Sequence, residues 1–213
     1  MNFQEAIAPY SANVLSYHLV ESILRDYKRP NDKISELLKS GELISLKKGL
    51  YMAGNKIKSP KPEPFLIANH LQGPSYVSLD SALSWYGFIP ERVYTITSIT
   101  TKSSRKYVNA VAEFEYIFQA LPYYALGIKQ IQLAENQYIM MASPEKALFD
   151  KIITTAGLQF QSKQDVMNYL LENLRIDEEK IHTLDIPTMK SWIDISPKKN
   201  SLSLLIKALE MYD

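Results

Sequence analysis

The chain has no cysteine among its 213 residues. It therefore has no disulfide, no thiol nucleophile and no thiolate ligand for a metal, and this composition fits a reducing compartment. Glycine is also scarce: there are seven, and none of them cluster as a phosphate-binding loop requires. These absences exclude several common classes of enzyme and metal site.

Long apolar runs are missing as well. No stretch approaches the roughly 18 continuous apolar residues of a membrane-spanning helix. The first thirteen residues have no basic segment followed by an apolar run, so we expect no signal peptide. The sequence predicts a cytoplasmic protein that has no membrane partner.

The residues that are present indicate a folded globular protein. Apolar residues make up 46% of the chain and charged residues 22%. The net charge of +1 hides an asymmetry. Residues 1–60 carry nine basic and six acidic side chains, whereas the remainder carries fifteen and seventeen. A basic excess confined to one segment is a hint of nucleic-acid binding in that segment.

Two helices are predicted near the N-terminus. The first begins with Ser11 as its N-cap and runs to about Tyr27, because apolar residues recur there every four positions. The second begins at Pro30, which suits the first turn of a helix, and ends at Gly41. A β-hairpin follows, with Lys47-Lys48-Gly49 as its turn.

This order of elements is typical of a winged helix-turn-helix. The second helix would read DNA in a groove, and the hairpin would act as a wing that contacts the phosphate backbone. The acidic residues Asp32 and Glu36 lie on or near the same surface and would repel phosphate. A module that contacts proteins instead of DNA is the alternative. The residues predicted to contact DNA are Lys28, Arg29, Asn31, Lys33, Ser35, Lys39, Lys47 and Lys48.

A proline- and lysine-rich stretch at residues 56–64 predicts a boundary between a domain at 1–60 and a domain at 61–213. The second domain reads as mixed α/β. Strands are predicted at residues 94–100 and 113–118 and through Met141, helices start after Ser78 and Ser143, and a helical tail begins near Gln164. The predicted class is α+β, with a winged helix followed by a mixed domain and its helical tail.

No catalytic, metal or cofactor site is predicted. The three histidines have no ligand spacing, and Ser78 and Ser143 are explained as helix caps. An enzyme would need a second-domain pocket lined by groups such as Asp80, Tyr86, Glu145 or Asp150, and we rank that reading last.

Three segments resemble the AbiEi antitoxin family. They are DKISELLKSGELISLKKGLYMAG (residues 32–54), YVSLDSALSWYGFIPERVYTITSITT (residues 76–101) and MASPEKALFDKI (residues 141–152). Their order and spacing are similar to those of the family, and the match covers about Ile34 to Ile153.

The resemblance implies a bacterial two-gene toxin–antitoxin system that protects against phage by abortive infection. It implies an N-terminal domain that binds inverted repeats upstream of its own operon and represses it, through Asp32–Lys39 and the wing Lys47–Gly49. The second domain would oppose a nucleotidyltransferase-like toxin. The alternative is a winged-helix regulator or adaptor that acts through protein contacts without neutralising a toxin. A second basic cluster, at Lys102, Arg105 and Lys106, would touch DNA, the toxin or only solvent.

Overall fold

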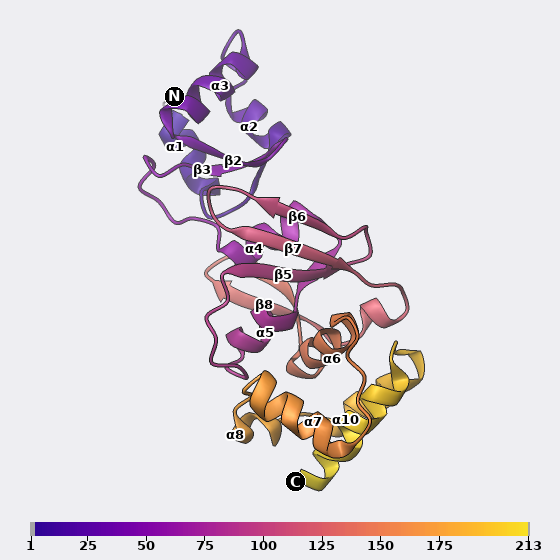
Figure 1. Cartoon of the computed structure of the whole chain (residues 1–213). Coiled ribbons are helices and arrows are strands. Elements are labelled where there is room, and N and C mark those ends of the chain that lie inside the picture. Colours follow the sequence, from indigo (N-terminus) through magenta and orange to yellow (C-terminus); the bar gives the residue numbers. More distant parts are fainter. Residues whose placement is uncertain (1–2, 213) are drawn as a thin grey trace.

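The structure is a computed structural model that describes residues 3–212. It combines helices with two β-sheets, so the predicted α+β class is confirmed. Figure 1 shows a small helical unit with its own sheet at one end, a larger sheet in the middle and a helical tail at the other end.

The N-terminal part, residues 3–53, packs short helices against a three-stranded sheet. Its strands lie in the order β1-β3-β2, and both pairs are antiparallel. The elements are α1 (Phe3–Ile7), the 3₁₀ helix η1 (Ala8–Tyr10), β1 (Leu15–Ser16), α2 (Tyr17–Ile23), α3 (Pro30–Ser40), β2 (Leu43–Lys47) and β3 (Leu50–Ala53).

The predicted helix from Ser11 to Tyr27 is confirmed only over α2, Tyr17–Ile23, and its predicted start is wrong. The chain first forms the short strand β1, in which Leu15 pairs with Tyr51. Helix α2 then begins after Ser16, whose side chain accepts a hydrogen bond from the backbone N–H of Leu19 at 3.2 Å. Pairing with a distant strand overrides the local helical pattern, and Ser16 is the cap instead of Ser11.

Helix α3 and the hairpin are confirmed. Pro30 lies in the first turn of α3, where a missing N–H costs nothing. Gly41 ends the helix with a left-handed backbone (φ +75°), and Gly49 takes φ +79° in the hairpin turn. Lys47 pairs with Leu50, so the turn is Lys48-Gly49, one residue shorter than predicted. A bulge lies between Ser45 and Lys47.

The second part, residues 64–212, is built on a six-stranded mixed sheet in the order β6-β7-β5-β4-β9-β8. The pairs β5–β7 and β4–β9 are parallel and the others antiparallel. The predicted strands at 94–100, at 113–118 and through residue 141 are confirmed. The strands are β4 (Ser75–Val77), β5 (Thr95–Thr100), β6 (Arg105–Val108), β7 (Glu113–Phe118), β8 (Ile128–Ala134) and β9 (Gln137–Ala142).

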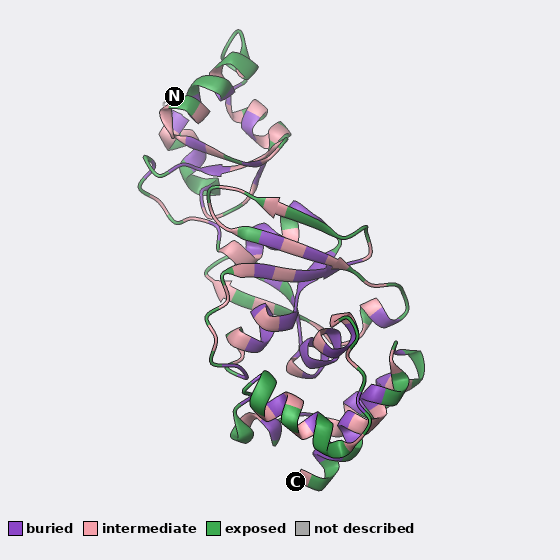
Figure 2. Cartoon of the chain, in the orientation of Figure 1, coloured by how far each residue is buried: buried purple, intermediate pink, exposed green. Residues whose placement is uncertain are grey.

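Helices cover this sheet and extend into the tail. Helices α4 and α5 pack against its strands, α6 packs against α5, and α10 packs on α6, α7 and α9. Buried residues continue along α10 (Figure 2), so the tail shares the main core. The helices are α4 (Pro64–Leu71), α5 (Leu79–Trp85), α6 (Pro144–Thr154), α7 (Lys163–Asn168), α8 (Glu178–Ile181), α9 (Ile186–Trp192) and α10 (Lys199–Tyr212), with short turns η2 (Tyr123–Ala125), η3 (Tyr169–Asn173) and η4 (Ile193–Ile195).

Buried hydrophobic side chains form two clusters. The smaller lies within residues 3–57, and the larger extends over residues 46–209. Leu46 and Met52, both from the hairpin, belong to the larger cluster, so the hairpin packs against the second part. Residues 54–63 between the two parts contain neither helix nor strand. The domain division near residue 60 stays a prediction.

Candidate nucleic-acid interface

Helix α3 exposes a surface of mixed charge. Its buried face carries Ile34 and Leu37. The opposite face is visible as the exposed stretch of α3 in Figure 2. The exposed positions of this face are Asn31, Asp32, Ser35, Glu36 and Lys39.

Two of the predicted basic contacts pair with acids of the same helix. The Lys33 amine lies 2.7 Å from the Glu36 carboxylate, and this hydrogen bond raises the pKa of Lys33. The Arg29 guanidinium lies 3.6 Å from Asp32. Such exposed pairs contribute little stability, but they lower the positive charge that α3 offers to phosphate.

Asn31 is held by a neighbouring helix. Its side-chain oxygen lies 2.9 Å from the Tyr17 hydroxyl, which is also 3.0 Å from Glu21. The single hydroxyl proton serves one of these acceptors at a time. Because the contact uses the oxygen of Asn31, the amide nitrogen is left to donate to a base edge. Ser35 is less available, since its hydroxyl donates to the Asn31 carbonyl at 3.0 Å.

The two hairpin lysines have different surroundings. The Lys47 amine donates a hydrogen bond to the Leu71 carbonyl of α4 and lies 5.9 Å from the centre of the Tyr107 ring. Lys48 is exposed and makes no ion pair or hydrogen bond with any residue between 3 and 212. Lys47 therefore anchors the hairpin to the second part, and Lys48 is the free charge of the turn.

Replacing Lys47 with methionine keeps the aliphatic stem but leaves the Leu71 carbonyl without its charged donor. Hydrogen bonds to charged groups are worth about 1.5–3 kcal/mol, so we expect the thermal midpoint to fall by roughly 5 °C. Lys48→Met is the matched control and should leave the midpoint unchanged. Equal midpoints for the two variants, measured by circular dichroism, would show that Lys47 is no anchor.

Among the eight residues predicted to contact DNA, Lys28, Lys39 and Lys48 are exposed and unpaired within the described part of the chain. The sequence pattern treats all eight alike. The structure separates these three from Arg29 and Lys33, which pair with acids, and from Lys47, which is docked.

The docked hairpin also forms one wall of a groove of about 420 Å³. The groove brings Lys47 next to Lys102 and Arg105, from the loop before β6 and the start of β6. Lys106, the third member of the cluster seen in the sequence, points elsewhere and pairs with Glu115 at 3.0 Å. Hairpin and loop thus contribute to one basic surface.

A second polar cluster is completely buried in the second part. The Lys146 amine lies 3.0 Å from the Asp150 carboxylate, and neither side chain has exposed surface. Three hydroxyl groups donate to the same carboxylate: Ser78 at 2.7 Å, Tyr123 at 2.8 Å and Tyr76 at 3.1 Å. We call these five residues the buried polar network.

The buried polar network explains a misread residue. Ser78 does precede helix α5 as predicted, but its side chain makes no cap, because its hydroxyl binds Asp150. The next residue, Leu79, takes a left-handed backbone (φ +56°) that is unusual for a branched side chain. Ser143, by contrast, caps α6 as predicted, accepting a hydrogen bond from the backbone N–H of Lys146 at 3.3 Å.

The electrostatics of the buried polar network favour a structural role. Burial lowers the pKa of Lys146, and the adjacent Asp150 carboxylate opposes that fall. Burial also raises the pKa of Tyr76 and Tyr123, so both phenols stay protonated and donate to the carboxylate. With no surface open to solvent, Lys146 and Asp150 are not placed to meet a substrate.

The four groups considered for an enzymatic pocket do not line one pocket, although burial and the nearby Glu145 charge both raise the pKa of Tyr86. Asp80 pairs with Lys151 at 2.6 Å, Glu145 accepts from the backbone N–H of Asp185 at 3.1 Å, and Asp150 belongs to the buried polar network. Asp80 lines a hollow that Tyr86, Glu145 and Asp150 do not reach. Within residues 3–212, no group of His, Asp and Glu side chains is placed to hold a metal ion.

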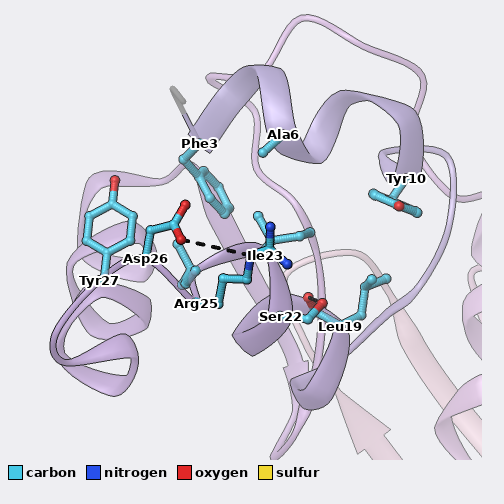
Figure 3. Close-up of a pocket in the computed structure, with 10 residues that line it drawn as sticks. Phe3, Ala6, Tyr10, Leu19, Ser22, Ile23, Arg25, Asp26 and Tyr27 are labelled. Carbon is cyan, nitrogen blue, oxygen red and sulfur yellow. Dashed lines mark hydrogen bonds and ion pairs between the residues drawn. The ribbon is translucent and has the colours of Figure 1, made fainter.

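Another hollow, of about 410 Å³, lies in the N-terminal part (Figure 3). Phe3, Leu19 and Ile23 give it apolar walls, and its polar content is chiefly an exposed ion pair between Arg25 and Asp26 at 3.9 Å. None of the described residues that line it is a nucleophile beside a base, so this hollow does not favour an enzyme.

Comparisons with known proteins bear on the fold. No protein-family model and no curated protein matches the chain. None of the helices described is long and apolar enough to span a membrane. Among solved structures, the chain is similar to the crystal structure of the RV2827C protein from Mycobacterium tuberculosis, with a TM-score of 0.65 and 13% sequence identity. The similarity covers 97% of this chain and 75% of that one, and at this identity it shows a shared fold.

Proposed function

We propose that the protein is a DNA-binding autorepressor and the antitoxin of a bacterial toxin–antitoxin pair. The proposed DNA binding is supported by the arrangement of α3 and the hairpin. Helices α1, α2 and α3 with a sheet of order β1-β3-β2 have the element order of a winged helix. In such a domain the helix before the hairpin enters the major groove of DNA.

The roles of the side chains follow from their surroundings. Lys28, Lys39 and Lys48 are free to neutralise phosphates, which position the protein on DNA without reading its sequence. The amide nitrogen of Asn31 is the group on α3 best placed to donate to a base edge. Asp32 and Glu36 lower the positive charge of α3. The salt dependence of binding therefore rests on the three free lysines.

The antitoxin half is supported by the resemblance of residues 76–101 and 141–152 to the AbiEi family. Those segments lie mostly in the core: Ser78 and Lys146, for example, belong to the buried polar network. Neutralisation of a nucleotidyltransferase-like toxin is then a property of the folded second part. It does not require these motif residues to touch the toxin.

The alternative, a winged-helix regulator or adaptor that works through protein contacts, is favoured by one observation. Trp85 and Tyr94 expose 44% and 77% of their surface, and Arg92 lies 5.5 Å from the Tyr94 ring. Exposed aromatic and arginine side chains are common at protein interfaces.

Co-expression separates the two functions. The neighbouring gene is induced in cells with and without this protein, alongside a reporter driven by the protein's own upstream DNA. We expect rescue of growth and repression of the reporter. Repression of the reporter without rescue of growth would favour the winged-helix regulator over the antitoxin. Absence of both repression and rescue would contradict the proposed function.

A further inference from the structure

The groove between the hairpin and the second part collects positive charge from three separate segments. Lys47 comes from the end of β2, and His70 and Gln72 come from the C-terminal end of α4 and its cap. Lys102 lies in the loop before β6, and Arg105 is the first residue of β6. Tyr107, on β6, completes the wall beside Lys47.

These charges are not neutralised by the protein. Lys102 and Arg105 are exposed and have no acidic partner among residues 3–212, and Lys47 is bonded to a backbone carbonyl. Among residues 3–212, no carboxylate lines the groove. Desolvation lowers the pKa of His70 below its usual value. The groove therefore holds three cations in about 420 Å³.

The walls of the groove are held in place by partly buried hydrogen bonds. Gln72 is only 7% exposed; its amide donates to the Ser103 carbonyl at 2.9 Å and its oxygen accepts from the Tyr107 hydroxyl at 3.2 Å. The Tyr107 ring lies within 6 Å of both the Lys47 amine and the Arg105 guanidinium. Loop, strand and hairpin are thus fixed around a shared space.

We propose that this groove binds a phosphate group, carried either by a free nucleotide or by the DNA backbone. Three converging cations match the several charges of a terminal phosphate or pyrophosphate, or of successive phosphodiesters along a DNA strand, better than the single charge of a carboxylate. The arginine fork suits tetrahedral oxyanions, and the lysines act as point charges. Only the DNA source rests on the proposed function; the nucleotide source does not.

Such a ligand would contact the hairpin and the second part at once. By mass action, a ligand that binds only the folded protein raises its thermal midpoint. An anion beside His70 would also favour the charged imidazole and raise the pKa of that residue. Both effects can be measured without DNA.

The test uses the full chain, titrated calorimetrically with sodium pyrophosphate and with ATP in the absence of divalent metal. Lys102→Ala/Arg105→Ala removes two of the cations. Lys106→Ala, one residue away but outside the groove, is the matched control. We expect the double variant to lose at least tenfold in affinity and the control less than twofold. The ligand should raise the NMR titration midpoint of His70 in the unmodified protein and in the control, but not in the double variant.

A parallel arm measures binding of the same variants to the protein's own upstream duplex. Loss of DNA affinity in the double variant, without any nucleotide binding by the unmodified protein, would assign the phosphate to DNA. If the protein binds pyrophosphate but not DNA, the groove is a phosphate site and the proposed DNA-binding function is wrong. If the double variant matches Lys106→Ala in both arms, the groove binds no phosphate.

Discussion

Replacing Asp150 with alanine is expected to lower the free energy of unfolding by about 3–5 kcal/mol. The substitution leaves the Lys146 ammonium buried without its counter-charge. It also removes the acceptor of the Ser78, Tyr76 and Tyr123 hydroxyl groups. At roughly 2–4 °C per kcal/mol for a chain of this size, the thermal midpoint should fall by about 10 °C.

A partly exposed ion pair nearby provides the control for Asp150→Ala. Asp80 on α5 is paired with Lys151 on α6, and both side chains are partly open to solvent. Asp80→Ala should lower the free energy of unfolding by no more than about 1 kcal/mol. Asp150→Asn, which keeps an acceptor oxygen but no charge, should fall between the two. Equal stability of Asp150→Ala and Asp80→Ala would contradict a structural role for the buried polar network.

The second large effect is expected on DNA binding. Reversing the charges of Lys28, Lys39 and Lys48 to glutamate removes the three exposed and unpaired cations of the N-terminal part. Each phosphate contact contributes about 0.9 to the slope of log affinity against log salt, so the slope should fall by almost three. With repulsion added, affinity at physiological salt should fall by about a hundredfold or more.

The control for this triple variant carries the same change in net charge. Lys129, Lys199 and Lys207 are exposed and make no ion pair among residues 3–212. They lie in the second part, on β8 and α10. Reversing these three should leave operator binding within a few fold. If both triple variants lose affinity equally, the protein binds through its overall charge, and the assignment to α3 and the hairpin is wrong.

The sequence predicts an element well where a local signal marks both of its ends. Pro30 and Gly41 bound α3, and Gly49 marks the hairpin turn, because these residues have backbone restrictions or freedoms that few others share. The start of the first helix is not predictable from local pattern, because Leu15 pairs with Tyr51 of a distant strand. The edge strands β6 and β8 were missed because they are largely solvated and alternate weakly.

The candidate site shows the same limit. The sequence shows which residues are basic but not which of them are free. Lys47 and Lys48 are adjacent and chemically identical, yet only the fold brings Leu71 to one of them. The groove likewise joins segments that are distant along the chain. The sequence does show a basic cluster at Lys102 and Arg105. It does not show that the hairpin lies beside this cluster in the fold.

The central claim is that the N-terminal part binds the protein's own upstream DNA. The most direct measurement is fluorescence anisotropy of the purified chain on that duplex and on a scrambled duplex, over a series of salt concentrations. We expect specific binding at about 10⁻⁸ M or tighter, at least a thousandfold preference over the scrambled duplex, and a steep salt slope. Equal, weak binding to both duplexes would contradict the claim.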